Sequence, residues 1–173
     1  MGLGYPGGPA LAKLAVSGRS NAFELPRPLL HSGNLDFSFA GLKTAVMTQY
    51  RKLGPGPSDA QRADLAASTQ AAIVELLVKK SMKAVELTGI RRLVVSGGVS
   101  ANAELRRQLD AAALRRGVRV HYPELALCTD NGAMIALAAA MRLADGASKA
   151  TRAYAFDVMP RWPLEALATE VIS

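Results

Sequence analysis

Two adjacent glycines, Gly97 and Gly98, form a turn over which a ligand could pass close to the backbone. They follow the apolar run 93–95 and precede Ser100 and Asn102, residue types that begin helices. A turn without side chains lets a ligand approach the backbone, and the amide groups that open a helix attract phosphate. The segment predicts either a nucleotide site, with Asn102 forming one hydrogen bond to the ligand, or a tight strand-to-helix turn with Ser100 as the N-cap.

A carboxylate at a second junction, Asp130, could bind a metal ion. It lies where a loop is expected to lead into a helix, and such an oxygen suits a hard or borderline cation. The alternative is that Asp130 is the N-cap or first-turn acid of that helix, favoured by the helix dipole. His31 and His121 lack metal-ligand spacing, and Cys128 has no neighbouring histidine and is interpreted as a loop or core residue.

Two further segments have both a functional and a structural interpretation. In the stretch 4–9, Gly7 and Gly8 could contact the sugar of a ligand, or they could simply complete a Pro-Gly turn. In the stretch 36–43, Lys43 could meet a phosphate or could be a solvated residue at a helix start. The spacing around Gly97 matches neither the dinucleotide fingerprint nor the Walker loop.

The elements that must position these residues follow from hydrophobic periodicity and from Gly and Pro breakers. Lys79, Lys80 and Lys83 are expected off the apolar face of the longest helix. Helices alternating with short strands predict an α/β fold. The expected helices span 10–17, 41–50, 58–87, 100–116 and 130–143, and the expected strands span 35–39, 92–96 and 118–122.

Composition limits the class of protein. The 173 residues, 50% of them hydrophobic, can bury one main core. A net charge of +7 fits contact with nucleic acid or another polyanion, or else solvated helix faces. One cysteine, without a signal peptide or an apolar run of spanning length, predicts a cytoplasmic protein with no membrane contact. Because the chain begins directly in a turn, we expect it to be part of a longer protein.

Four stretches together resemble one family in their order and spacing. The resemblance is to the C-terminal half of the tRNA N6-adenosine threonylcarbamoyltransferase family (TsaD), long labelled O-sialoglycoprotein endopeptidase or glycoprotease. The end of the chain, 160–164, is similar to the end of bacterial members. The stretches are Gly-Tyr-Pro-Gly-Gly-Pro (4–9), Leu-Asp-Phe-Ser-Phe-Ala-Gly-Leu-Lys-Thr-Ala (35–45), Val-Ser-Gly-Gly-Val-Ser-Ala-Asn (95–102) and Cys-Thr-Asp-Asn-Gly-Ala-Met-Ile-Ala (128–136).

The resemblance implies the actin-like ATPase (ASKHA) fold, with residues 1–145 as its second, ribonuclease-H-like lobe and 146–173 as a C-terminal tail. It implies transfer of a threonylcarbamoyl group from threonylcarbamoyl-AMP to N6 of the adenosine beside a tRNA anticodon. The implied partners are tRNA and other proteins of the threonylcarbamoyladenosine-synthesis complex. We also expect a homodimer through the lobe surface that a missing half would otherwise cover.

The resemblance also implies roles for single residues. Gly8 and Asn102 match positions that contact the adenylate, threonylcarbamoyl-AMP or an ATP-like ligand. Gly97 and Gly98 match the diglycine that backs the nucleotide, and Asp130 matches a ligand of an active-site iron or zinc ion. The family's His-x-x-x-His metal motif, phosphate-binding segment and further substrate aspartate belong to its N-terminal half, which this chain lacks. We therefore expect the 173 residues alone to be inactive.

Three alternatives accompany this interpretation. The chain could be a non-catalytic nucleotide-binding or scaffold domain, such as a truncated paralogue. It could belong to a related carbamoyltransferase, although the ending 160–164 favours the tRNA family. Endopeptidase activity is disfavoured because the sequence offers no Ser/His/Asp set and no zinc-protease motif.

Overall fold

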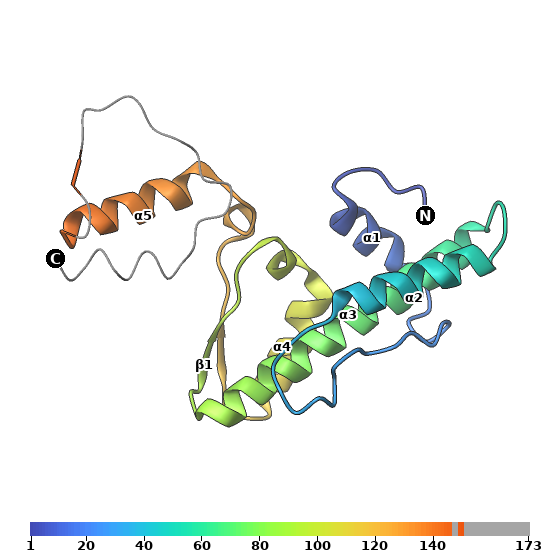
Figure 1. The fold of residues 1–173 in the computed structure, drawn as a ribbon, viewed down its shortest axis with the longest axis horizontal. Coiled ribbons are helices and arrows are strands. Elements are labelled where there is room, and N and C mark those ends of the chain that lie inside the picture. Colours follow the sequence, from blue (N-terminus) through green and yellow to red (C-terminus); the bar gives the residue numbers. More distant parts are fainter. Residues whose placement is uncertain (147–148, 151–173) are drawn as a thin grey trace. The chain divides into compact units, whose positions relative to one another are not determined.

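The central element of the fold is the 30-residue helix α3 (Asp59–Thr88), which is labelled in Figure 1. A capping box fixes its start: Ser58 Oγ accepts from the backbone N–H of Gln61, and the Gln61 side chain accepts from the N–H of Ser58. Gly89, at φ +69°, ends the helix in the left-handed conformation. The predicted helix 58–87 is confirmed.

The computed structural model describes residues 1–146 and 149–150, and the chain divides into two units, Met1–Thr129 and Asp130–Ser173. In the first unit, α1 (Gly7–Ala15), α2 (Phe39–Lys52) and α4 (Ala103–Leu114) pack on α3. The second unit contains α5 (Gly132–Ala144). The predicted ending 160–164 and nearly all of the predicted tail lie outside the described residues, and the domain boundary at 145 stays a prediction.

A short parallel sheet completes the first unit. Strands β1 (Arg92–Val94) and β2 (Arg119–His121) pair in the register Arg92–Arg119, Leu93–Val120 and Val94–His121, and α4 forms the crossover between them. This β–α–β arrangement agrees with the predicted α/β class, but the sheet of the described residues has two strands where three were predicted. The unit is a mainly helical domain with a two-stranded parallel sheet.

Three apolar clusters lie along α3, one for each helix that packs on it. The α4 cluster includes Val74, Met82 and Leu109, and the inward residues Leu93 and Val120 of the strands cover it. The α2 cluster joins Leu42 to Leu76, and the α1 cluster joins Ala15 to Ala66 and Ala67. The small alanine side chains allow α1 to approach α3 closely.

The predicted strand 35–39 is wrong. Phe39 begins α2, and the segment before it has no strand partner in the part of the chain that the structure describes. Asn34 instead forms a local turn, because its side chain donates to the Asp36 carboxylate (2.7 Å) and accepts from the Asp36 N–H (3.2 Å). Phe37 and Phe39 stack on each other at 5.5 Å and remain partly exposed. Alternation alone therefore did not make a strand, because residues 1–146 and 149–150 provide no strand beside this segment.

Lys80 also departs from expectation. It was predicted off the apolar face with Lys79 and Lys83, but its side chain is buried, with 4% of the residue exposed. Its ammonium donates to Ser32 Oγ (3.0 Å) and to the carbonyl oxygen of Asn34 (2.6 Å). The loop around residue 33 covers α3 at this point, and these hydrogen bonds compensate for the desolvation of the charge. Lys80 thus anchors a loop.

Among the described residues, no helix combines the length and the apolar character needed to cross a membrane.

A pH-sensitive contact joins α3 to the segment before α2. Glu75 accepts hydrogen bonds from Lys79 and from Arg27 Nε (2.9 Å), and these bonds, that of Lys79 first, hold the pKa of Glu75 below its ordinary value of 4.5. The unfolded chain then binds more protons than the folded one as the pH falls. The stabilisation is complete above about pH 4.5 and is lost as the pH drops through the folded pKa.

We therefore expect Glu75→Gln to destabilise the protein at neutral pH by under about 1 kcal/mol, since the pair is partly exposed. This difference from wild type should shrink towards zero in acid. Urea unfolding at about pH 7 and about pH 3 measures it. An equal loss at both pH values would show that the charge of Glu75 is not responsible.

Candidate functional site

The backbone of the diglycine turn is open. Gly97 has φ +85° and ψ 171°, a conformation that residues with a side chain essentially do not adopt. Gly98 has an ordinary φ, and a Cβ atom added at either glycine would meet nothing within 4 Å. Gly97 is therefore required by the fold, whereas no contact with the described residues requires a glycine at position 98. An unfilled space beside Gly98 is what a ligand lying on the backbone needs.

Asn102 lies five residues after Gly97 and is the N-cap of α4. A short 3-10 turn, η1 (Gly98–Ala101), separates them, so the predicted helix 100–116 begins only at residue 103. The Asn102 Oδ1 accepts from the N–H of Leu105 (2.9 Å), and its Nδ2 donates to Gln70 Oε1 (2.9 Å). The proposed cap at Ser100 is wrong because Asn102, with its extended backbone, satisfies the first turn instead.

Ser100 and Cys128 fix the turn from behind. Both are buried, and Ser100 Oγ donates to the Cys128 sulfur at 3.2 Å. Arg106 Nε donates to the carbonyl oxygen of Ser100 (2.6 Å), and its Nη2 donates to that of Pro123 (3.3 Å). The thiol is therefore a packing group inside the unit, as predicted for Cys128. These contacts hold the backbone of η1 in one conformation.

Arg106 was not singled out by sequence reasoning. Its guanidinium lies 4.5 Å from the centre of the Tyr122 ring, a cation–π contact. Burial of Tyr122, together with its hydrogen bond to Asp110 (2.8 Å), raises the pKa of this phenol well above its ordinary value of 10. The available signal was the spacing of four residues from Asn102, which places Arg106 on the same side of α4.

Asn102 also lines a cleft of about 410 Å³ formed by α1, α3 and the start of α4. Gln70 and Glu104 contribute further polar groups to its wall. The hydrogen bonds that Glu104 accepts from Arg107 and Gln108 lower the pKa of this carboxyl group. The cleft therefore carries a fixed amide and a carboxylate that stays ionised at neutral pH.

Gly8 lies on α1 but does not line this cleft. It is exposed in the first turn of α1, and a Cβ there would meet nothing within 4 Å. Ala12 and Ala15, one and two turns further along, line the cleft. The structure thus places Gly97, Gly98 and Asn102 in one turn, and Gly8 on a neighbouring helix about 6 Å along the axis from Ala12.

Asp130 belongs to the second unit and immediately precedes the N-cap of α5. That cap is Asn131, whose Oδ1 accepts from the N–H of Met134 at 3.1 Å, so the interpretation of Asp130 as the cap is wrong. Asp130 is exposed. Within residues 1–146 and 149–150, no group of three or more His, Cys, Asp or Glu side chains could hold a metal ion. One carboxylate does not make a metal site.

Comparison with known proteins decides the family. A family model described as tRNA N6-adenosine threonylcarbamoyltransferase matches residues 1–137. The chain belongs to this family. The predicted resemblance is confirmed, and the diglycine turn and Asn102 lie within the matched residues.

Relatives named tRNA N6-adenosine threonylcarbamoyltransferase match nearly the whole chain. That of Verminephrobacter eiseniae is 71% identical over 168 residues, which are 97% of this chain and 48% of the relative. That of Paracidovorax citrulli is 70% identical with the same coverage, and that of Variovorax paradoxus is 70% identical over 96% of this chain and 47% of the relative. The chain therefore spans about half the length of these members of the threonylcarbamoyltransferase family.

Proposed function

We propose that this chain forms part of the acyl-adenylate site of an enzyme that transfers a threonylcarbamoyl group from threonylcarbamoyl-AMP to N6 of the adenosine beside a tRNA anticodon. The observation that carries the proposal is identity of about 70% over nearly the whole chain to threonylcarbamoyltransferases. Residues 1–145 would form the second, ribonuclease-H-like lobe of an actin-like ATPase fold. We propose a cytoplasmic location, which the proposed tRNA substrate and the single cysteine support.

The reaction is an acyl transfer. The lone pair of the adenosine N6 amine attacks the carbamoyl carbonyl carbon and forms a C–N bond. The bond from that carbon to the phosphate oxygen of AMP breaks, and AMP leaves with the electron pair. N6 loses one proton to solvent. The products are threonylcarbamoyladenosine in tRNA, AMP and a proton.

The contribution of this chain is to bind and orient the adenylate. The open backbone at Gly97 and Gly98 would lie under the nucleotide, and Asn102 would contact it through the second lone pair of Oδ1 or the second N–H of Nδ2, because each of these atoms forms only one hydrogen bond within the chain. Gly8 would approach the ligand from α1. A site held rigid from behind by Arg106 needs little reorganisation when the ligand binds.

The family's metal does not fit the described residues alone. We propose Asp130 as one ligand of an iron or zinc ion whose other ligands come from the part of the relatives that this chain does not span. No part of the transfer described above is assigned to that ion.

Joining the chain to the missing half tests the proposal. The 173 residues alone, incubated with tRNA and threonylcarbamoyl-AMP, should yield no modified adenosine. The same chain fused behind the first half of the Verminephrobacter relative, with the other proteins of the synthesis complex present, should yield it. Nucleoside mass spectrometry of the tRNA measures both. Product from the chain alone, or none from a fusion that is folded, would contradict the proposal.

A non-catalytic scaffold is the second candidate. The exposed apolar side chains of α5, such as Ile135 (73%) and Leu137 (63%), offer a surface for a partner protein or for the expected homodimer. Light scattering separates a dimer from a monomer.

A further inference from the structure

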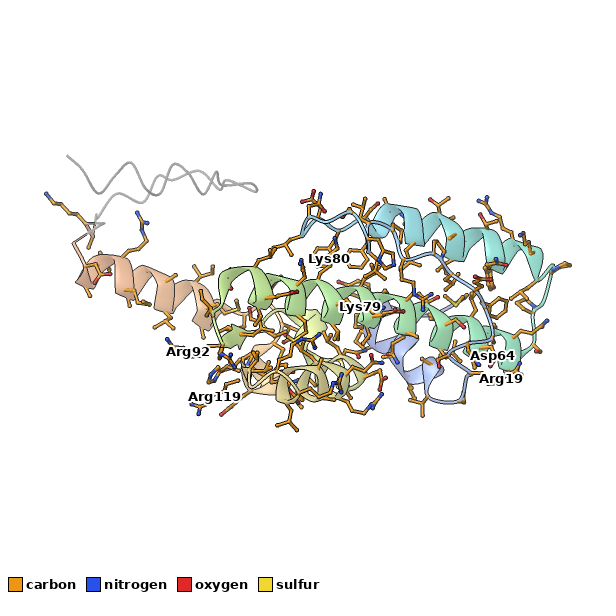
Figure 2. The ribbon with its side chains drawn as sticks, turned by 90° about the horizontal axis from the view of Figure 1, so that it is seen from below. Arg19, Asp64, Lys79, Lys80, Arg92 and Arg119 are labelled. Atoms are coloured by element: carbon orange, nitrogen blue, oxygen red, sulfur yellow. The ribbon has the colours of Figure 1, made fainter. Side chains whose placement is uncertain are left out.

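A cluster of exposed arginines lies at the opposite end of β1 from the diglycine turn. Arg92 and Arg119 begin the two strands and are register partners (Figure 2). Arg91 precedes β1, and its Nη1 donates to the carbonyl oxygen of Arg116 (3.2 Å), beside Arg115 at the end of α4. These five residues are called the arginine end below.

The charges of the arginine end are not balanced by acids. Within residues 1–146 and 149–150, none of its five guanidinium groups forms an ion pair with a carboxylate, whereas Arg19, Arg27 and Arg107 all do. The C-terminus of α4 offers Arg115 and Arg116 only a partial negative charge. Adjacent like charges repel one another, so this surface is stabilised when an anion binds to it.

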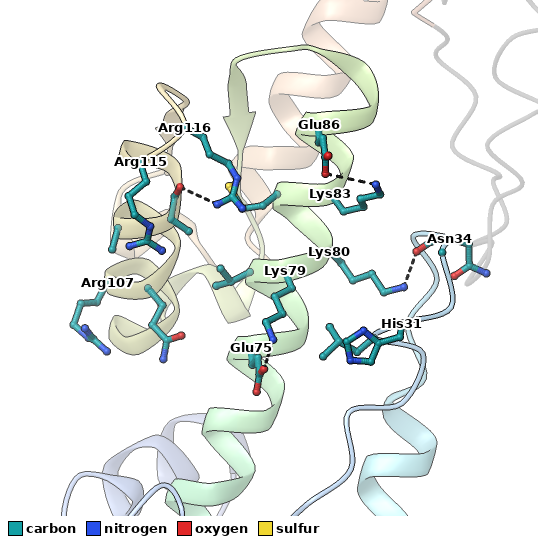
Figure 3. Close-up of a pocket in the computed structure, with 17 residues that line it drawn as sticks. His31, Asn34, Glu75, Lys79, Lys80, Lys83, Glu86, Arg107, Arg115 and Arg116 are labelled. Carbon is teal, nitrogen blue, oxygen red and sulfur yellow. Dashed lines mark hydrogen bonds and ion pairs between the residues drawn. The ribbon is translucent and has the colours of Figure 1, made fainter.

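The arginine end continues into a concave surface. Arg115 and Arg116 line a cleft of about 740 Å³ along α3 and α4, in which Lys79 points to Glu75 and Lys83 to Glu86, all four on α3 (Figure 3). Six Lys and Arg side chains line the cleft, but Lys79, Lys83 and Arg107 pair with glutamates and Lys80 is buried under a loop. Among the described residues, Arg115 and Arg116 are the cations of the cleft that have no carboxylate partner. The arginine end is therefore large enough to contact more than one phosphate group. Its surface is concave where Arg115 and Arg116 line the cleft.

We propose that the arginine end and this cleft bind the phosphate backbone of a folded RNA. The inference rests on the proposed function, which supplies an RNA substrate, and it places the contact away from the nucleotide turn. The planar guanidinium fork matches phosphate oxygens in pairs, and several cations in sequence match a repeated anion. A groove fits a rounded backbone strand better than it fits a flat membrane.

The experiment compares two triple variants with equal loss of charge. Arg92→Gln, Arg115→Gln and Arg119→Gln change exposed side chains that have no hydrogen-bond partner among the described residues. Lys13→Gln, Arg51→Gln and Lys52→Gln are the matched control on α1 and α2, also exposed. Fluorescence anisotropy measures binding of labelled unmodified tRNA to the 173-residue chain at several salt concentrations, after circular dichroism has verified that both variants are folded.

We expect the triple variant of the arginine end to weaken tRNA binding about tenfold or more. The slope of log K against log salt should become less steep by about 2 to 3, because each phosphate that is no longer neutralised contributes about 0.7–0.9 to the slope. The control should leave the slope unchanged. Equal weakening by both triples would overturn the proposal. Leu87 and Ile90 are exposed near the arginine end, so binding to vesicles with about a quarter anionic lipid is measured as well. If the arginine triple loses vesicle binding but binds tRNA as wild type does, the proposal of an RNA site is overturned.

The outcome is independent of catalysis. tRNA binding that depends on the arginine end, in a chain whose fusion makes no product, would preserve this inference and remove the proposed function. If the fusion makes product but the arginine triple leaves tRNA binding unchanged, the proposed function stands and this inference is removed.

Discussion

Gly98→Ala should weaken nucleotide binding at least about tenfold while leaving the fold intact. The added Cβ meets no atom of the described residues within 4 Å, and φ at Gly98 is ordinary, so the free energy of unfolding should change by less than about 0.5 kcal/mol. The same methyl group would occupy the space in which the adenylate is proposed to lie. We expect the affinity of the fused protein for AMP, measured by calorimetry, to fall at least about tenfold, equal to about 1.4 kcal/mol.

Gly97→Ala provides the contrast within the same turn. Its φ of +85° and ψ of 171° exclude a side chain without strain, so this variant should lose about 1–3 kcal/mol of stability as well as AMP affinity. If Gly98→Ala binds AMP as tightly as wild type, the turn is only a strand-to-helix connection. The pair of variants thus separates a glycine needed for the backbone from one needed for the ligand.

Leu109→Ala should be among the most damaging substitutions in the first unit. Leu109 is 1% exposed and lies in the cluster between α3 and α4 that also supports both strands. Truncating a buried leucine removes apolar contact and leaves a cavity, at a cost of about 2–5 kcal/mol. Urea unfolding should show this loss, with a fall in Tm of about 2–4 °C for each kcal/mol in a chain of this length.

Leu114→Ala is the matched control for Leu109→Ala. It makes the same chemical change on the same helix, but Leu114 is 81% exposed. Its effect should stay within about 0.5 kcal/mol. Similar losses in both variants would mean that helix propensity, rather than the α3–α4 core, determines the stability of this region.

Both ends of α3 were predictable because the interactions behind them are local. Ser58 and Gln61 are three residues apart, and Gly89 ends α3 through its own backbone freedom. The apolar run before Gly97 and the helix after it fix a parallel β–α–β connection once the second strand is recognised. The Gly97–Gly98 turn could be singled out for the same reason.

The N-caps show the limit of this local reasoning. Ser100 and Asp130 were reasonable caps by residue type, yet Asn102 and Asn131 perform that role. Which residue becomes the N-cap depends on which one has extended backbone in the folded turn. Ser100 is instead drawn into the interior by Cys128, which is 28 positions away.

By itself, the sequence determined the family, the long helix α3 and the glycine turn, because motifs and caps are interactions among neighbours in the chain. Only the tertiary structure decided the burial of Lys80, the absence of a strand at 35–39 and the structural role of Arg106. Lys80 is buried because a loop 46 and 48 positions away packs over it and accepts its hydrogen bonds. The gathering of arginines from β1, α4 and β2 likewise depends on strand register, which brings Arg92 beside Arg119.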